Sequence, residues 1–163
     1  MEKLEFQKRF PMFSEVFQDE HGVLIGYTRQ TVKVTGTAGK TLQIGDFLVM
    51  DAVSSETATI PADIEAIKAA KVLAIYAGNE AYQNMNTDNS SYNHNVTEFL
   101  ADRLTQEVVV INRGPIGLSW GGPVGTTKHF SGLKFPAGTS KADIKAVHAK
   151  LTDQGFKILR QVP

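Results

Sequence analysis

The apolar residues of this chain fall into short runs of strand length, which glycine, proline and polar turn residues separate. Residues 72–78 form a continuous apolar run, and residues 107–112 form the clearest strand, ended by Arg113-Gly114-Pro115. Shorter β-branched or alternating segments are found at 22–27, 31–35, 42–49, 116–120 and 156–160. Because runs of this length suit strands better than helices, we expect a strand-rich domain.

The best helix of the sequence lies near the C-terminus. Ser140 is a good N-cap with Asp143 three residues later, and Gly155 stands where the helix would end. Between them, three apolar residues align on one face: Ile144, Val147 and Leu151. Segments 61–70 and 97–105 are expected to form short helical turns. The predicted fold class is therefore mainly β (α+β), a small β-sandwich-like domain with one C-terminal helix.

Composition excludes several classes of function. The chain has no cysteine, which rules out disulfide scaffolds, thiolate zinc sites and cysteine nucleophiles. It has 17 basic and 17 acidic residues, whereas a general nucleic-acid binder needs a basic excess. The first twenty residues lack the apolar run of a signal peptide, and no stretch approaches the roughly 18 apolar residues of a membrane span. We expect a soluble protein made in a reducing cytoplasm, without direct nucleic-acid or membrane partners.

The N-terminal segment is rich in phenylalanine. Four rings recur at the spacing of a helix, although Pro11 interrupts the pattern: Phe6, Phe10, Phe13 and Phe17. One interpretation is that these rings cap the core of their own domain. The other is that residues 1–30 form an extended arm whose aromatic side binds a neighbouring subunit.

The remainder, residues 31–163, is predicted to be a single β-rich domain. It contains an Asn-rich polar stretch at 79–95, which we interpret as an insertion loop between strands. Charge is uneven along the chain, since residues 1–100 carry 8 basic and 13 acidic side chains and residues 101–163 carry 9 and 4. This asymmetry could help subunits associate, although solvation of the surface is the simpler interpretation.

Catalytic motifs are matched only superficially. Gly117-Leu118-Ser119-Trp120-Gly121 has the spacing of a nucleophile elbow, but the following Gly122-Pro123 cannot begin the helix that this elbow requires. Asp143 and His148 follow Ser119 in the chain order of the hydrolases that use this elbow. They lie five residues apart on one predicted helix, however, so their side chains point in different directions. We therefore predict no enzymatic activity.

Cofactor and metal motifs are matched no better. Gly39-Lys40-Thr41 lacks the preceding glycine and the following helix of a phosphate loop. The four histidines are scattered, without the spacing of metal ligands. We predict no cofactor and no metal.

Two features point to contacts with other proteins. Trp120 is the only tryptophan, and it suits either the core or an oligomer contact beside a glycine turn. A series of basic residues from 128 to 150 includes Lys141 and Lys145, one helical turn apart. This series is either a solvated helix face or a contact for an acidic partner.

The order of these segments resembles the head decoration (capsid cement) proteins of tailed bacteriophages, the lambda-like class. The resemblance rests on residues 32–34, 42–49, 71–77 and 107–115, followed by the helix, glycine and closing strand of residues 141–160. It covers about residues 30–160 and contains no catalytic signature. The Phe-rich segment and the Asn-rich loop depart from the compact form of the family.

The resemblance implies a β-tulip domain on the outside of the expanded capsid. Such proteins commonly sit as trimers at three-fold positions and stabilise contacts between major capsid protein subunits, so the implied location is the exterior of a virion assembled in the host cytoplasm. The aromatic arm, Phe6, Phe10, Phe13 and Phe17, is then the candidate capsid- or neighbour-binding element, with Trp120 as a candidate oligomer contact. The alternatives are another virion or tail component, or a glycan-binding β-domain that stacks sugars on Trp120, Tyr82 and Tyr92.

Overall fold

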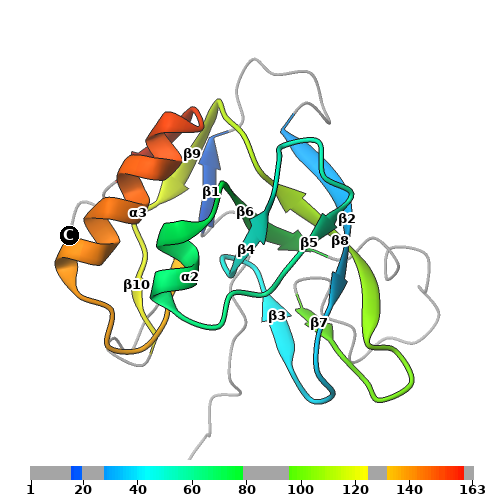
Figure 1. Ribbon diagram of the computed structural model, residues 1–163. Coiled ribbons are helices and arrows are strands. Elements are labelled where there is room, and N and C mark those ends of the chain that lie inside the picture. The colour runs from blue at the N-terminus through cyan, green and yellow to red at the C-terminus, as the bar shows by residue number, and fades with distance from the viewer. Residues whose placement is uncertain (1–15, 20–27, 79–95, 125–131, 160–163) are drawn as a thin grey trace, which may run out of the picture.

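The computed structural model describes residues 16–19, 28–78, 96–124 and 132–159 (Figure 1). Within these ranges it is mainly β, with two helices. The elements in chain order are β1 (Phe17–Asp19), β2 (Arg29–Thr35), β3 (Thr41–Gln43), β4 (Phe47–Met50), β5 (Thr57–Ala58), α2 (Ile64–Ala69), β6 (Val72–Gly78), β7 (Val96–Glu98), β8 (Thr105–Ile111), β9 (Ile116–Ser119), β10 (Gly122–Pro123), β11 (Lys134–Phe135), α3 (Lys141–Asp153) and β12 (Phe156–Leu159).

Five strands form a sheet that curls almost into a closed barrel. Their order is β4-β6-β8-β2-β5, and β2 and β8 pair antiparallel along their whole length. The two outer strands also meet, because Thr59, directly after β5, exchanges two backbone hydrogen bonds of 2.9 Å with Val49 of β4. Closure of this kind pairs backbone groups that an open sheet would leave at its edges.

The sequence of each strand matches its position in this sheet. Val32 and Val34 of β2 are buried and alternate with exposed residues, as expected of a strand with one face in water. In β6, the residues from Leu73 to Tyr76 are all 0% exposed, so both faces of the strand are covered. The continuous apolar run at 72–78 is thus an interior strand of the sheet, covered on both faces.

A second sheet and α3 lie on one side of the barrel (Figure 1). In this sheet, β9 pairs antiparallel with β1 and parallel with β12, and α3 packs against β12. The helix begins as predicted, because the Ser140 hydroxyl accepts a hydrogen bond from the backbone N–H of Asp143 at 3.1 Å and donates one to its carboxylate at 2.7 Å. Ile144, Val147 and Leu151 face the core, as predicted.

Side-chain amides join the end of α3 to the barrel. Gln154, the C-cap of α3, accepts from the backbone N–H of Leu73 at 2.9 Å and donates to the carbonyls of Leu73 and Asn112 at 2.8 and 2.9 Å. The buried Asn112 amide in turn donates to Gln30 Oε1 at 2.8 Å and to the Val53 carbonyl at 2.9 Å. These amides supply partners to buried backbone where the strand ladders end.

The predicted fold class is confirmed, with two local differences at 97–105 and within residues 1–30. The strands expected at 31–35, 72–78, 107–112, 116–120 and 156–160 are present within a residue or two, as are the turn at Gly45-Asp46 and the helical turn in 61–70. The segment expected at 22–27 and the loop at 79–95 lie outside the described residues.

The helical turn predicted at 97–105 is wrong. Residues 96–98 form β7, which pairs with β3, and Phe99 continues this pairing through its N–H to the Lys40 carbonyl at 2.9 Å. Leu100 and Arg103 then close a turn into β8. Pairing with a distant strand outweighed a weak local helical pattern.

Parts of the arm predicted at 1–30 are strands, because β1 is hydrogen-bonded to β9 and β2 begins at Arg29; residues 1–15 and 20–27 lie outside the described residues. Residues 16–19 and 28–30 therefore belong to the folded domain. Neither described helix is long and apolar enough to cross a bilayer.

Candidate binding surface

The structure separates the residues predicted to bind a neighbour. Phe6, Phe10 and Phe13 lie outside the described residues. Phe17 lies in β1 opposite Leu118 and is only 5% exposed, within the hydrophobic core. For this ring the first interpretation of the sequence is correct: Phe17 stabilises its own domain and is not available to a partner.

Trp120 lies just after β9, half-buried against the core. Its backbone N–H donates to the Leu159 carbonyl at 3.0 Å, and its ring meets the His148 ring edge-on at a centroid distance of 4.3 Å. Trp120 also lines a cavity of about 600 Å³ alongside α3. The tryptophan is thus partly a core residue, and it also contributes to a hollow on the surface.

His148 of α3 holds this arrangement together. Its ring lies between Trp120 and Phe135, and its Nε2 forms a 2.9 Å hydrogen bond with the Trp120 carbonyl. Burial lowers the pKa of His148, an effect that this hydrogen bond partly opposes. The Nδ1 atom is buried and has no hydrogen-bond partner among the residues that the structure describes.

The serine motif does not form a nucleophile elbow. Ser119 is 1% exposed and lies within β9, in register with Leu159 of β12, whereas an elbow presents its serine at an exposed strand-to-helix turn. Asp143 is engaged by Lys68 at 2.8 Å and His148 by the Trp120 carbonyl. The three side chains are therefore not arranged as a triad.

Lys68 links the two helices. Its ammonium group contacts Asp143 at 2.8 Å and Glu65 at 2.7 Å, and these hydrogen bonds raise the pKa of Lys68 to about 12. The same contact with Lys68, together with the Ser140 hydroxyl, lowers the pKa of Asp143. No group of His, Asp or Glu that could hold a metal occurs in the described part of the chain.

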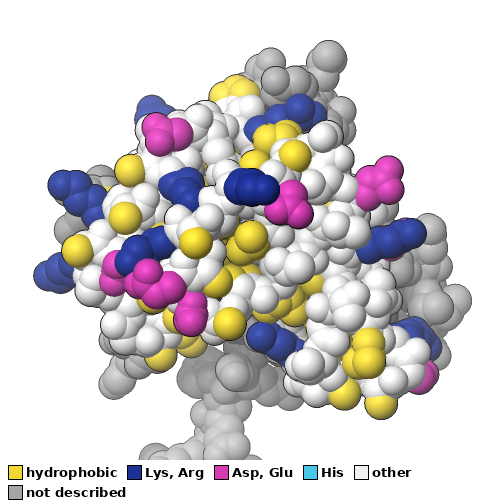
Figure 2. Space-filling view, viewed as in Figure 1, with side chains coloured by type: hydrophobic (Ala, Val, Ile, Leu, Met, Phe, Trp, Pro, Cys, Tyr) yellow, Lys and Arg dark blue, Asp and Glu magenta, His cyan; other side chains and the backbone are white. Residues whose placement is uncertain are grey.

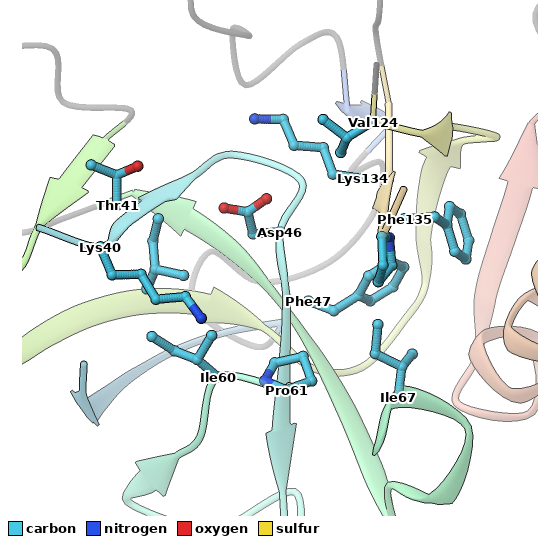
Figure 3. A pocket seen from close by; sticks show the side chains of 12 residues that line it. Lys40, Thr41, Asp46, Phe47, Ile60, Pro61, Ile67, Val124, Lys134 and Phe135 are labelled. Atoms are coloured by element: carbon cyan, nitrogen blue, oxygen red, sulfur yellow. The ribbon is translucent and has the colours of Figure 1, made fainter. Parts of the chain in front are cut away.

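A small pocket opens beside the β3–β4 turn (Figure 3). It has a volume of about 190 Å³ and is lined by apolar side chains from five segments: Leu42 with Phe47, Ile60 with Pro61, Ile67, Val124, and Phe135 with Pro136. Lys40, Asp46 and Lys134 add polar groups to its rim, and Figure 3 shows Asp46 and Lys134 across the pocket from Ile60 and Pro61. In the space-filling view, hydrophobic side chains are exposed between α2 and the β3–β7 pair, with a basic side chain beside them (Figure 2).

Asp46 has a structural task in this pocket. Its carboxylate accepts the Gln43 backbone N–H at 2.7 Å, and its own N–H donates to the Gln43 carbonyl at 3.0 Å, so it closes the turn between β3 and β4. Lys134 donates to the Gln43 side chain from the other side. Burial raises the pKa of Asp46, while Lys134, the Gln43 N–H and Lys40 lower it in part.

The pocket's dimensions suit a protein side chain. Small-molecule sites enclose about 300–1,000 Å³, and this pocket is smaller. An apolar floor with a few charges at the rim is typical of a recess that receives one anchoring side chain from a partner. Sequence analysis missed this pocket because its residues come from distant segments, each of which resembles an ordinary strand or turn.

Comparisons with other proteins leave this surface as the main guide to function. No protein-family model, curated protein or solved structure matches the chain. A role must therefore be argued from the residues and their geometry.

Proposed function

We propose that this chain is a structural virion protein that binds the outside of the expanded capsid of a tailed bacteriophage and stabilises contacts between major capsid protein subunits. In this proposal it acts as a trimer on the shell, without catalysis or a cofactor. It reaches the virion exterior after synthesis in the host cytoplasm.

The observation that carries the proposal is the order of elements along the chain. The segments that resemble capsid decoration proteins form β2, the β3–β4 turn, β6 and β8, followed by α3 and β12. They belong to one domain with a shared core.

Two features of the surface fit a role in binding proteins. The pocket beside the β3–β4 turn can receive one side chain, and Val124 at its edge is 51% exposed. β1, which follows residues 1–15 in the chain, is paired with β9 of the domain. Phe6, Phe10 and Phe13 remain the candidate binding residues of the proposed arm.

A symmetric shell would make modest contacts sufficient. Each trimer would engage several capsid subunits at once, so the affinities of individual contacts combine through effective concentration. A pocket of about 190 Å³ and a short aromatic arm are adequate on such a lattice.

The test is co-sedimentation of the purified chain with expanded, undecorated shells assembled from the major capsid protein encoded alongside it. We expect saturation at a stoichiometry set by the lattice, with shells that resist higher temperatures. A variant lacking residues 1–15 and a Val124→Asp variant should both bind more weakly. Leu104→Asp is the matched control, because Leu104 is also an exposed apolar residue, at 41%, but does not line the pocket.

The outcomes separate the parts of the proposal. If the wild-type chain does not bind expanded shells, the capsid role is wrong, and tail components and glycans are tested next. If the truncated variant binds as well as the wild type, the shell is bound by the domain and the arm hypothesis fails.

A further inference from the structure

The cavity alongside α3 is a groove with an apolar floor. Its volume is about 600 Å³, and its floor is formed by Trp120, Ile144, His148 and Ile158. Ala149 and Thr152 of α3 complete one wall. A groove of this size holds more than one side chain, in contrast to the small pocket at the β3–β4 turn.

The rim of the groove carries positive charge that no residue in the described part of the chain neutralises. Lys141 and Lys145 line the groove one helical turn apart, and both are exposed. Neither has an ion pair or a side-chain hydrogen bond in the described part of the chain.

The other charges of α3 lie away from the groove. Asp143 is paired with Lys68, and Lys150 donates to the carbonyls of Lys68 and Ala70 near the end of α2. Asp153 does not line the groove. Of the three lysines of α3, Lys150 is hydrogen-bonded within the domain, whereas Lys141 and Lys145 lie on one face of the helix beside the apolar floor of the groove.

These observations together specify a partner. An apolar floor gains free energy by burying apolar side chains, and uncompensated ammonium groups at its rim favour carboxylates. A basic partner would be repelled, and a wholly polar one would leave the floor exposed to water. We infer that the α3 groove binds an acidic segment of a partner protein, whose aromatic or aliphatic side chains enter between α3 and β12 while its carboxylates meet Lys141 and Lys145.

This inference deepens the proposed function, on which it rests for the identity of the partner, a capsid subunit. The chemistry of the groove can be tested separately, because Trp120 is the only tryptophan of the chain and lines the groove. Its fluorescence therefore reports directly on the site.

The experiment selects peptides from a random library on the full chain. We expect the selected peptides to combine acidic with aromatic or aliphatic residues and to shift Trp120 emission on titration. A Lys141→Glu/Lys145→Glu variant should bind them about tenfold more weakly or worse, and added salt should weaken binding to the wild type. Ala149→Tyr, which fills the groove from an exposed position, should abolish binding without removing any packed side chain.

Two control variants match these changes. Lys71→Glu/Arg103→Glu alters net charge equally at exposed positions outside the groove, and Ala146→Tyr adds the same ring to another exposed face of α3. Both should bind the selected peptides as the wild type does. If no peptides are selected, if they lack acidic residues, or if the groove variants bind them normally, the inference is wrong.

Shell binding then distinguishes failure of the groove from failure of the function. If shells bind the wild type and the Lys141→Glu/Lys145→Glu variant equally, the capsid role stands and the groove does not contact the capsid, which overturns the inference. If the peptides bind but shells do not, the chemistry of the groove stands and the capsid role is wrong. If the wild type binds no peptide but self-associates, and the Lys141→Glu/Lys145→Glu variant does not self-associate, a second copy of the chain occupies the groove and the inference is wrong.

Discussion

Replacing Gln154 with alanine would remove the side chain that connects the end of α3 to the buried strand β6 of the barrel. The amide of Gln154 makes three hydrogen bonds, two with the backbone of Leu73 and one with the carbonyl of Asn112. Leu73 and Asn112 are 0% and 1% exposed, so water cannot easily replace the lost partner. In this part of the fold, the glutamine acts as a short additional strand beside β6.

The expected loss follows from these contacts. A hydrogen bond contributes about 1 kcal/mol net, and a buried group left unpaired costs about 1–3 kcal/mol. For three bonds we expect Gln154→Ala to lower the free energy of unfolding by about 3 kcal/mol. In a domain of this size that corresponds to a decrease in Tm of about 6–12 °C.

Thermal unfolding followed by circular dichroism, and urea unfolding followed by Trp120 fluorescence, measure this loss. Asp153→Ala is the matched control, because it truncates the neighbouring exposed residue and should leave Tm nearly unchanged. Gln154→Glu should also destabilise at neutral pH, since it sets a carboxylate against two carbonyl oxygens, and should recover in part on acidification. If Gln154→Ala has the same Tm and the same urea midpoint as Asp153→Ala, the amide contacts do not stabilise the domain and the reasoning is refuted.

Three further predictions concern charge and backbone. Burial raises the pKa of Asp46 above 3.8, so the ionised carboxylate is disfavoured in the folded state. Asp46→Asn should therefore raise Tm at pH 7, and this gain in Tm should vanish below pH 3.8. Thermal unfolding at a series of pH values measures both effects. Burial lowers the pKa of His148 below 6.5, so on acidification the imidazole is protonated in the unfolded chain before it is protonated in the folded one. The stability that His148 contributes is therefore complete above pH 6.5 and decreases as the pH falls toward the pKa of the folded state. His148→Gln should flatten this part of the pH profile, and an unchanged slope would contradict the assignment. Gly121→Ala should lower Tm far more than Gly39→Ala, although both glycines have positive φ (+72° and +80°). A Cβ at Gly121 would lie 1.9 Å from the Leu133 carbonyl oxygen, whereas a Cβ at Gly39 would meet nothing within 4 Å. Equal melting temperatures of the two variants would show that the close approach is absent.

Interactions within a few residues could be read from the sequence. The strands at 31–35, 72–78 and 107–112 follow from β-branched and apolar runs, and α3 follows from the Ser140 cap and one apolar face. These patterns work because hydrogen bonding and burial within one element depend on its own periodicity. The single tryptophan, Trp120, lines the groove, and whether it contacts another subunit stays a prediction.

Interactions between distant segments were decided by the tertiary structure. Phe17 is buried because β9 pairs with β1, about a hundred residues earlier in the chain, and residues 96–98 are a strand because β3 supplies their partner. The pocket at the β3–β4 turn and the α3 groove likewise combine side chains from separate segments. The sequence by itself determined most of the strands and the helix α3, because those elements follow their own local periodicity; residues 96–98 are the exception. Which surfaces those segments bury, and which hollows they leave, depends on pairing across the fold that no local pattern encodes.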